Sequence, residues 1–212
     1  MTEAEDHAYA KALDDFLECH VDGEGRRGAV QVFHAVRALP YRSGPDRTPL
    51  GGLRSGRCAC TARHMILRDA LRRLGFFADV EMVSCDFAAG IPPHPSMPPE
   101  VRKLAGSGGV RDVHCWVRAR LGENNLSVLM DATWCDAYAS VGFPVNTGWN
   151  GTGDTRPAAV GVVQATPEDV LASKEELLAV LTDEEASARK AFLAGLSAWL
   201  EELPAGQEGG RA

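Results

Sequence analysis

The sequence predicts an α+β protein in which a helix that begins at a cysteine packs on an antiparallel sheet. From Cys60 onward, apolar residues recur every three or four positions, which is the period of a helix with one buried face. The segments 113–121 and 126–133 instead alternate apolar and polar residues, as half-buried strands do. Only Gly122–Asn125 separates these two segments, so they are expected to form a hairpin. Extra helices are expected at both ends of the chain.

The composition is that of one ordinary globular domain. The chain has 212 residues, of which 45% are hydrophobic and 24% are charged. We expect a single domain over residues 1–203 and a disordered tail at 204–212. Within the domain, the core is expected at about 40–160 and a C-terminal helical extension at about 166–203.

Charge and cysteine content restrict the partners. The net charge is −7 at pH 7 and the pI is about 5.4, whereas a nucleic-acid partner usually requires an excess of Lys and Arg. The acidic start has no apolar run that could serve as a signal peptide or a membrane span, so we expect a cytoplasmic location and no membrane partner. In that setting the six cysteines are expected to be free thiols. The oligomeric state is not predicted.

The N-terminal part is expected to form two helices and a loop. Residues 3–20 carry apolar side chains at helical spacing, and three glycines between positions 23 and 28 end this helix. A second helix follows over 30–39 and stops at Pro40, which has no amide hydrogen to donate. The stretch 43–56 is rich in Gly, Pro and polar residues, so a loop should lead into the cysteine helix.

The cysteine helix is expected to run from Cys60 to Leu74, with Gly75 placed to end it in a left-handed conformation. Unpaired amides and the helix dipole at its start would stabilise a thiolate on Cys60, which is the nucleophilic form. Several arginines surround this helix. They either favour an anionic substrate or belong to a solvated face with internal ion pairs, and the second interpretation is preferred. These residues are Arg54, Arg57, Arg63, Arg68, Arg72 and Arg73.

The predicted strands bring a histidine and an aspartate together. A four-residue turn in the hairpin sets three pairs: Leu121 with Leu126, Trp116 with Asp131, and His114 with Thr133. Paired residues share a face of the sheet, so the Asp131 carboxylate should accept a hydrogen bond from the His114 imidazole. The alternative is an ordinary core hairpin with both side chains on the surface.

The remaining elements are less informative about function. A strand at 78–82 precedes a proline-rich connection at 91–99, which suits a loop at the rim of a site or a plain surface loop. A loop is expected at 142–151, and Thr166 and Thr182 then begin two capped helices. The second helix carries an apolar stripe that must be buried against the domain or a partner subunit, and Pro204 stops it. The stripe consists of Phe192, Leu196, Trp199 and Leu203.

A thiol, an imidazole and a carboxylate thus follow one another in the order of a nucleophilic triad. Cys60 would attack an acyl group, His114 would act as base and then as acid, and Asp131 would orient the imidazole. No cofactor and no metal is implied. Trp116 and Trp149 are candidates to contact the substrate, although a core position is preferred for Trp149.

Together these segments resemble the transglutaminase-like superfamily of papain-like Cys-His-Asp enzymes. The family pattern has a cysteine at a helix start, Leu-Leu-Arg-x-x-Gly at the end of that helix, and then His-Ala-Trp-Val and Asp-Pro-Thr or Asp-Ala-Thr on successive strands. Within residues 50–135 the matching residues are Cys60, Arg72, Gly75, His114–Val117 and Asp131–Thr133. The helix start, Cys60-Thr61-Ala62-Arg63-His64, also looks like a bacterial-type subgroup.

The resemblance implies a transglutaminase-like core in which the cysteine helix packs on the sheet that supplies His and Asp. It further implies a thiol-dependent amide hydrolase or acyltransferase that works through a Cys60 thioester, rather than a protein cross-linking enzyme. The implied partner is a peptide, a protein or a small amide substrate.

Three alternatives stay open. The glycine expected two residues before the nucleophile is Cys58, which could itself be the nucleophile, but the distances to Arg72 and Gly75 favour Cys60. A chain without retained chemistry would be a scaffold that binds a peptide or a protein. A zinc site is less expected, because no Cys-x-x-Cys pair occurs and His114 and Cys115 point to opposite faces of their strand. Its ligands would be drawn from Cys58, Cys60, His64, His114, Cys115 and Cys135.

Overall fold

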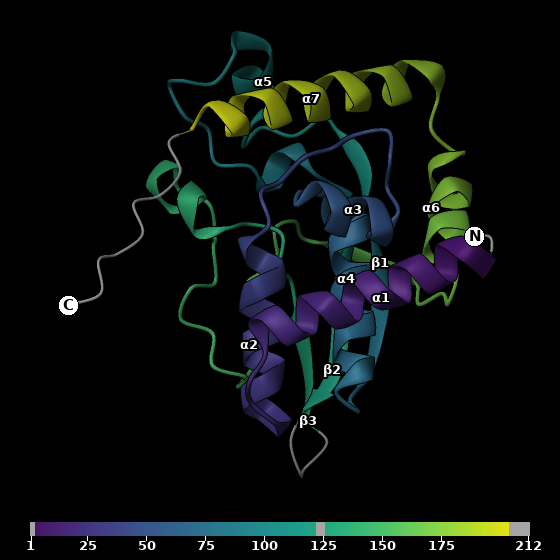
Figure 1. The fold of residues 1–212 in the computed structure, drawn as a ribbon. Coiled ribbons are helices and arrows are strands. Elements are labelled where there is room, and N and C mark those ends of the chain that lie inside the picture. Colours follow the sequence, from purple (N-terminus) through teal and green to yellow (C-terminus); the bar gives the residue numbers. More distant parts are fainter. Residues whose placement is uncertain (1–2, 122–125, 204–212) are drawn as a thin grey trace.

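The computed structural model describes residues 3–121 and 126–203, so the predicted turn at Gly122–Asn125, the stop at Pro204 and the predicted tail at 204–212 lie outside the described residues. Helices pack on a four-stranded antiparallel sheet with the strand order β3-β2-β1-β4, which confirms the mixed α+β class (Figure 1). The strands are β1 Phe77–Asp86, β2 Arg111–Leu121, β3 Leu126–Met130 and β4 Gly161–Ala165.

Seven α-helices lie within the described ranges: α1 Glu3–His20, α2 Gly25–Ala38, α3 Pro49–Ser55, α4 Cys60–Arg73, α5 Pro99–Leu104, α6 Val170–Leu178 and α7 Asp183–Glu202. Two 3₁₀ turns, Ala88–Gly90 and Asp136–Val141, complete the secondary structure of this part of the chain. None of its helices is long and apolar enough to cross a membrane.

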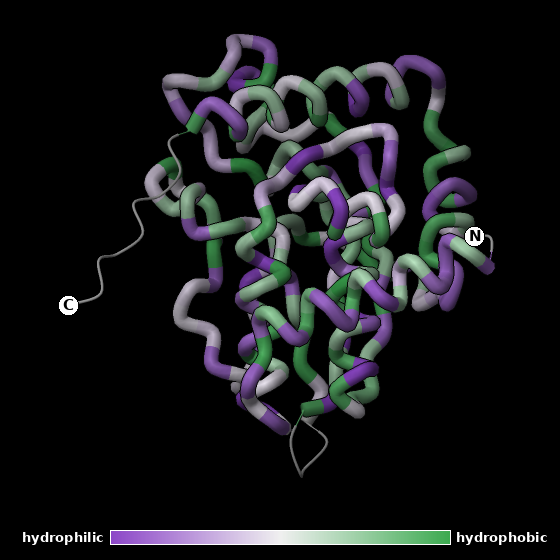
Figure 2. The backbone as a smooth tube through the Cα atoms, in the orientation of Figure 1, coloured by the Kyte–Doolittle hydropathy of each residue, from purple (hydrophilic) through white to green (hydrophobic). Residues whose placement is uncertain are grey.

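Helix α4 is the central helix of the main core. It packs on β1 and β2 on one side and contacts α1, α2 and α3 on the other (Figure 1). The alternate residues of β2 from Val113 to Leu121 join the apolar face of α4 in one buried cluster. In contrast, the outer helix α1 alternates hydrophilic and hydrophobic residues along its length (Figure 2). The cysteine helix is therefore held rigidly between the sheet and an outer layer of helices.

A second core lies between the proline-rich connection and α7. Its largest members are aromatic, and they include Trp134, Tyr138, Phe143, Phe192 and Trp199. Helix α7 begins with the expected capping box, because the Thr182 side chain accepts from the Glu185 amide and the Glu185 side chain accepts from the Thr182 amide. The predicted apolar stripe on α7 is thus buried within this same chain.

The predicted register of the hairpin is correct as far as the strands pair. The β2–β3 ladder runs from Leu121↔Leu126 to Val117↔Met130 and ends there. The expected pairs Trp116–Asp131 and His114–Thr133 are therefore wrong, since the chain leaves the sheet after Met130. The amide of Asp131 donates to Thr155 Oγ1, 2.7 Å away, in place of a ladder bond to β2.

Helix α3 occupies half of the stretch 43–56 that we expected to be a loop. The side chain of Thr48 accepts a hydrogen bond from the Gly51 amide, and Pro49 follows at the first helical position. Gly56 then ends the helix with φ of 65°. These are ordinary start and stop signals, which the high content of glycine and proline obscured.

Helices α2, α5 and α6 and strands β1 and β4 also differ from the sequence prediction, and β1 extends from the expected 78–82 to Phe77–Asp86. Helix α2 begins at Gly25, so two of the three glycines expected to lie between the helices belong to it. Helix α5, which starts within the proline-rich connection, and the edge strand β4 were not predicted. Helix α6 is capped by Asp169, whose side chain accepts from the Ala172 amide, and not by Thr166.

Candidate active site

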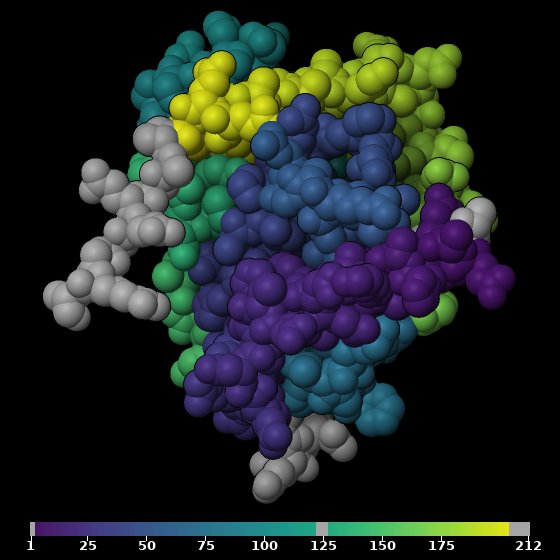
Figure 3. Space-filling model, in the orientation of Figure 1, coloured from purple at the N-terminus to yellow at the C-terminus, as the bar shows by residue number. Residues whose placement is uncertain are grey.

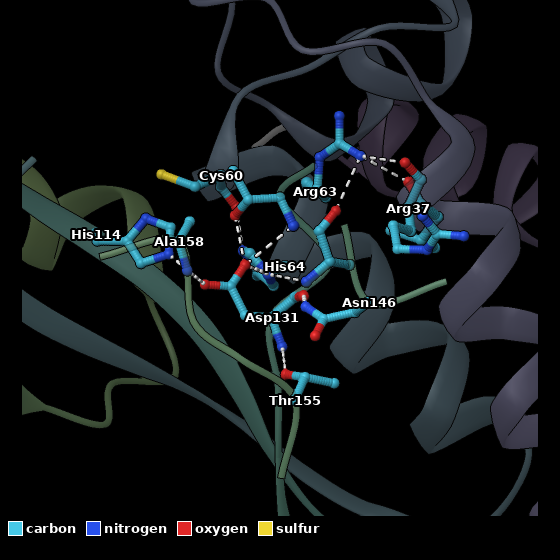
Figure 4. Close-up of polar contacts among 12 residues, drawn as sticks. Arg37, Cys60, Arg63, His64, His114, Asp131, Asn146, Thr155 and Ala158 are labelled. Carbon is cyan, nitrogen blue, oxygen red and sulfur yellow. Dashed lines mark hydrogen bonds and ion pairs between the residues drawn. The ribbon is translucent and has the colours of Figure 1, made fainter. Parts of the chain in front are cut away.

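Cys60 occupies the first position of α4, where the backbone amides have no partner within the helix. The preceding residue, Ala59, has no side-chain acceptor for those amides. Only 5% of Cys60 is exposed. In Figure 4 its sulfur lies on the side of α4 that faces the His114 ring.

His114 and Asp131 form the predicted hydrogen bond. Nε2 of His114 lies 2.8 Å from Oδ2 of Asp131, and both side chains are buried. The alternative in which both residues lie on the surface is therefore wrong. The other ring nitrogen of His114, Nδ1, has no hydrogen-bond partner among the described residues. A buried ring nitrogen without a protein partner is available to exchange a proton with a neighbouring group.

Asp131 is itself fixed by donors from three segments. The amide of Thr133 donates to Oδ1 at 2.9 Å, and the amide of Ala158 donates to Oδ2 at 2.7 Å (Figure 4). The hydroxyl of Thr133 also donates to Oδ1. Burial alone would raise the pKa of Asp131, but the adjacent His114 holds that pKa well below its usual range. Asp131 is thus a fixed anion that orients the imidazole.

The charges around Cys60 favour its thiolate form. A hydrogen bond from Cys115, acting against burial, and the positive charges of Lys174 and His114 hold the pKa of the Cys60 thiol well below its usual range. Burial would lower the pKa of His114, but the Asp131 carboxylate and Cys60 raise it to about 10. The contact with Cys60 and burial raise the pKa of Cys115 well above its usual range, so Cys115 remains the donor.

Lys174 is a site residue that the sequence did not reveal. It projects from α6 and is 4% exposed. Its Nζ lies 3.7 Å from Cys60 Sγ and donates to Thr61 Oγ1 at 2.8 Å. No motif could have identified it, since a lysine in the second turn of a capped helix usually faces solvent.

His64 fastens the start of α4 to the segment that follows β3. Its Nδ1 lies 2.8 Å from the Cys60 carbonyl oxygen, and its Nε2 accepts from the Ala132 amide at 3.0 Å. Nε2 is also 3.5 Å from Asp131 Oδ1, but a nitrogen that accepts from Ala132 has no proton to donate there. His64 therefore holds the backbone of the cysteine and of the aspartate in fixed relation.

Arg63 ties three further segments to the site without any carboxylate partner among the described residues. Its guanidinium donates to the carbonyl oxygens of Val36, Arg37, Leu39, Pro40, Cys58 and Ala132. Val36, Arg37 and Leu39 lie at the C-terminal end of α2, where the helix dipole is negative, and Pro40 follows directly.

The two candidate nucleophiles, Cys58 and Cys60, have different surroundings. Cys58 is packed in the main core, and burial raises the pKa of its thiol. Cys60 instead interacts with His114 and Lys174. All six cysteines are free thiols, as expected.

The two tryptophans proposed as substrate contacts already have partners in the protein. The Trp116 indole donates to Glu81, and its ring meets the His114 ring edge to face at 6.2 Å. The Trp149 ring packs against Phe33 of α2 in a tilted arrangement, with ring centroids 4.6 Å apart, and its indole donates to the Gly153 carbonyl. These contacts agree with the preferred core position of Trp149.

Most of the arginines around α4 form ion pairs, as the preferred interpretation stated. The pairs are Arg57–Glu201, Arg68–Asp69, Arg72–Asp79, Arg72–Glu168 and Arg73–Asp14. The solvated face expected in that interpretation does not extend to Arg63 and Arg68, which are buried, and Arg63 binds only carbonyl groups. Within the ranges 3–121 and 126–203, no group of three or more His, Cys, Asp or Glu side chains could hold a metal ion.

Comparison of the chain with protein-family models, with curated proteins and with solved structures finds no match.

Proposed function

We propose that this protein is a thiol-dependent amide hydrolase or acyltransferase with a transglutaminase-like core. Cys60 is the nucleophile, His114 the general base and then acid, and Asp131 the residue that orients the imidazole. The substrate is a peptide, a protein or a small amide. The expected setting is the cytoplasm, where free thiols persist.

One observation carries the proposal. His114 is held by Asp131 at 2.8 Å through one ring nitrogen, while the other ring nitrogen is unpartnered and Cys60 lies beside the ring. A buried carboxylate, imidazole and thiol in this order form the arrangement that nucleophilic acyl transfer requires. The location of Cys60 at a helix start adds amide donors that can stabilise an oxyanion.

In the proposed reaction the Cys60 thiolate attacks the carbonyl carbon of the amide. The bond to nitrogen breaks as the imidazolium of His114 gives its proton to the leaving amine, and a thioester forms on Cys60. Neutral His114 then removes a proton from water or from an acceptor amine, which attacks the thioester and regenerates the thiolate. His114 finally returns to its protonated form as the product leaves.

The test is formation of an acyl-enzyme with p-nitrophenyl acetate. The wild-type protein should release nitrophenolate in a burst and carry one acetyl group on Cys60, which peptide mass mapping locates. His114→Ala should slow acetylation near pH 6 by about tenfold or more, because the thiolate loses its imidazolium partner. Asp131→Asn should give an intermediate loss.

Cys58→Ala is the matched control, because it removes a thiol two residues away and should acetylate as the wild type does. Acetylation of Cys58 in the wild type, or equal rates in the wild type and His114→Ala, would contradict the proposal.

The rival function is a scaffold that binds a peptide or protein at the same place. The burial of Cys60, which is only 5% exposed, favours this rival because a substrate must displace or pass the groups that cover the thiol. A Cys60 that alkylates only with the pH profile of an ordinary thiol, combined with no acyl-enzyme, would make the scaffold the better account.

A further inference from the structure

Lys174 is a buried cation whose nearest possible anion is the nucleophile itself. It forms no ion pair with a carboxylate among the described residues, and its donors reach only Thr61 Oγ1 and Cys60 Sγ. A buried ammonium group without a counter-ion is costly, so the Cys60 thiolate stabilises Lys174 as much as Lys174 stabilises the thiolate.

The neighbouring buried anions are already engaged. Asp131 accepts from His114, and Asp112 accepts from Arg189 at 2.7 Å. Neither carboxylate is free to balance Lys174. In the resting site the charges therefore cancel in pairs, and the Lys174–Cys60 pair is the one that the proposed reaction disrupts.

Acylation removes the partner of Lys174. Attack converts the thiolate into a neutral thioester, while Lys174 stays in a buried position next to the new acyl group. The acyl-enzyme would then hold an unpaired buried cation, unless the acyl group itself supplies a negative charge.

A cavity provides room for such a group. It has a volume of about 320 Å³, and Thr61 and Lys174 line it together with Leu171 and Leu178 of α6. The opposite wall is the loop before α3, which lies beside α6 in the space-filling view (Figure 3). The remaining lining residues are Pro45, Asp46, Arg47, Thr48 and Glu175.

The charged groups at the opening differ from Lys174 in their exposure. Asp46 and Glu175 are exposed carboxylates, and Asp46 already accepts from the amide and the hydroxyl of Thr48. Charges in water are screened, whereas the charge of buried Lys174 acts at low dielectric. Arg47, the other cation of the lining, is half-buried. Cys60 does not itself line the cavity, but its neighbour Thr61 does, and so does Lys174, whose Nζ lies 3.7 Å from the Cys60 sulfur. Lys174 is therefore the buried charge that connects the cavity with the thiol.

We infer that the acyl group transferred to Cys60 carries a carboxylate or a similar anion, which Lys174 binds in this cavity. The inference rests on the proposed function, because it concerns the acyl group of the same thioester. It makes Lys174 a specificity-determining residue in addition to Cys60, His114 and Asp131.

The test compares two alkylating reagents that differ mainly in charge. Iodoacetate carries a carboxylate, and iodoacetamide is its neutral counterpart. Both react with the same thiolate, so the ratio of their rates at Cys60 does not depend on the thiolate fraction or on the thiol pKa. The ratio therefore measures only whether the site attracts or repels the negative charge of iodoacetate.

Lys174→Met should lower the ratio of iodoacetate to iodoacetamide rates at Cys60 by about tenfold or more, because an ammonium group some 4 Å from the reagent is lost. Lys190→Met makes the same chemical change at an exposed position of α7 and should leave the ratio within about twofold of the wild type. Lys174→Gln serves if the methionine variant does not fold. The ratio for wild-type Cys60 should also exceed that of the same cysteine in urea.

The outcomes separate the two proposals. An equal ratio in the wild type and in the Lys174 variants, with a rapidly alkylated Cys60, would overturn the inference and leave the proposed function intact. A Cys60 that reacts with neither reagent in the folded protein would contradict both.

Discussion

Arg63 shows how one residue can fix the surroundings of a site without forming an ion pair. Its exposed fraction is 0%, and all six hydrogen bonds go to backbone carbonyl groups of three separate segments. Carbonyl dipoles at a helix C-terminus stabilise a cation, and a planar guanidinium can satisfy several acceptors at once. An ammonium group has only three donors and a different geometry, so lysine cannot replace it.

Arg63→Lys should therefore lower the free energy of unfolding by about 2–4 kcal/mol, because several buried carbonyls lose their donor. Urea denaturation measures this. Arg57→Lys is the control, since the Arg57 side chain is 44% exposed and pairs with Glu201 at 3.2 Å at the surface. It should change the free energy of unfolding by less than about 1 kcal/mol. Equal effects of the two substitutions would show that the carbonyl cluster adds no stability.

For individual residues, the sequence allowed a prediction where the position follows from the local strand or helix pattern. His114 and Asp131 could be placed close together because the predicted hairpin register holds up to Met130, although the chain leaves the sheet before Asp131 and the expected pairing there is wrong. Lys174 could not, because its burial depends on the packing of α6 against α4 and β2. The contact of Cys115 with Cys60 was also missed, since strand alternation gives a face but not the distance to a helix terminus.

Among the elements, the long and strongly patterned ones were predictable. The cysteine helix, the outer helix α1 and the hairpin strands carry clear periods. Helices α3 and α5 span seven and six residues, which is too short for a period to emerge. Strand β4 was missed because its residues are mostly exposed, so no alternation marks it. Strand β4 is held in the sheet by its backbone pairing with β1, and its own sequence carries no strand pattern.

The junction of α1 and α2 depends on a close backbone approach, which explains why a glycine lies inside a helix. A Cβ atom at Gly28 would lie 2.5 Å from the Gly23 carbonyl oxygen. Alanine normally favours a helix over glycine by about 1 kcal/mol, but this contact leaves no room for it.

Gly28→Ala should therefore lower the free energy of unfolding by about 1–3 kcal/mol, despite the better helix propensity of alanine. Gly44→Ala is the control, because a Cβ atom there meets nothing within 4 Å. It should leave the free energy of unfolding within about 0.5 kcal/mol of the wild type. Thermal unfolding of both variants, followed by circular dichroism, tests the contact. A Gly28 variant as stable as the wild type would mean that α2 shifts away without cost.

For the whole molecule, the candidate site lies where the two cores meet. Cys58 and Cys115 belong to the main core, whereas Tyr41 and Phe87 belong to the second core beneath α7. The C-terminal helices close this junction: α6 supplies Lys174, and α7 supplies Arg189 to the ion pair with Asp112. The expected helical extension is thus part of the site rather than an appendage. This is a property of the tertiary packing that the sequence pattern alone could not predict.

The buried charges of the site should also shape the dependence of stability on pH. The pKa of His114 is raised to about 10, so its contribution is complete below the unfolded pKa of about 6.5 and is lost as the pH rises toward 10. The pKa of Cys60 is depressed, so its contribution is complete above the unfolded pKa of about 8.5 and is lost as the pH falls. Between about pH 6.5 and 8.5 these two slopes have opposite signs and cancel.

Cys60→Ala removes the contribution of Cys60 to the pH dependence of the free energy of unfolding. The opposing contribution of His114 should then become measurable. The free energy of unfolding of the wild type should exceed that of the variant by an amount that grows with pH, by up to about 3 kcal/mol between pH 6.5 and 8.5. Urea denaturation at several pH values measures the difference. In Cys58→Ala the difference from the wild type should change by less than about 0.5 kcal/mol over this range, because burial raises the pKa of folded Cys58 and the unfolded thiol begins to ionise only near pH 8.5. An equally small change for Cys60→Ala would mean that Cys60 is protonated in the folded protein at neutral pH, and that the thiolate on which the proposed chemistry depends does not form.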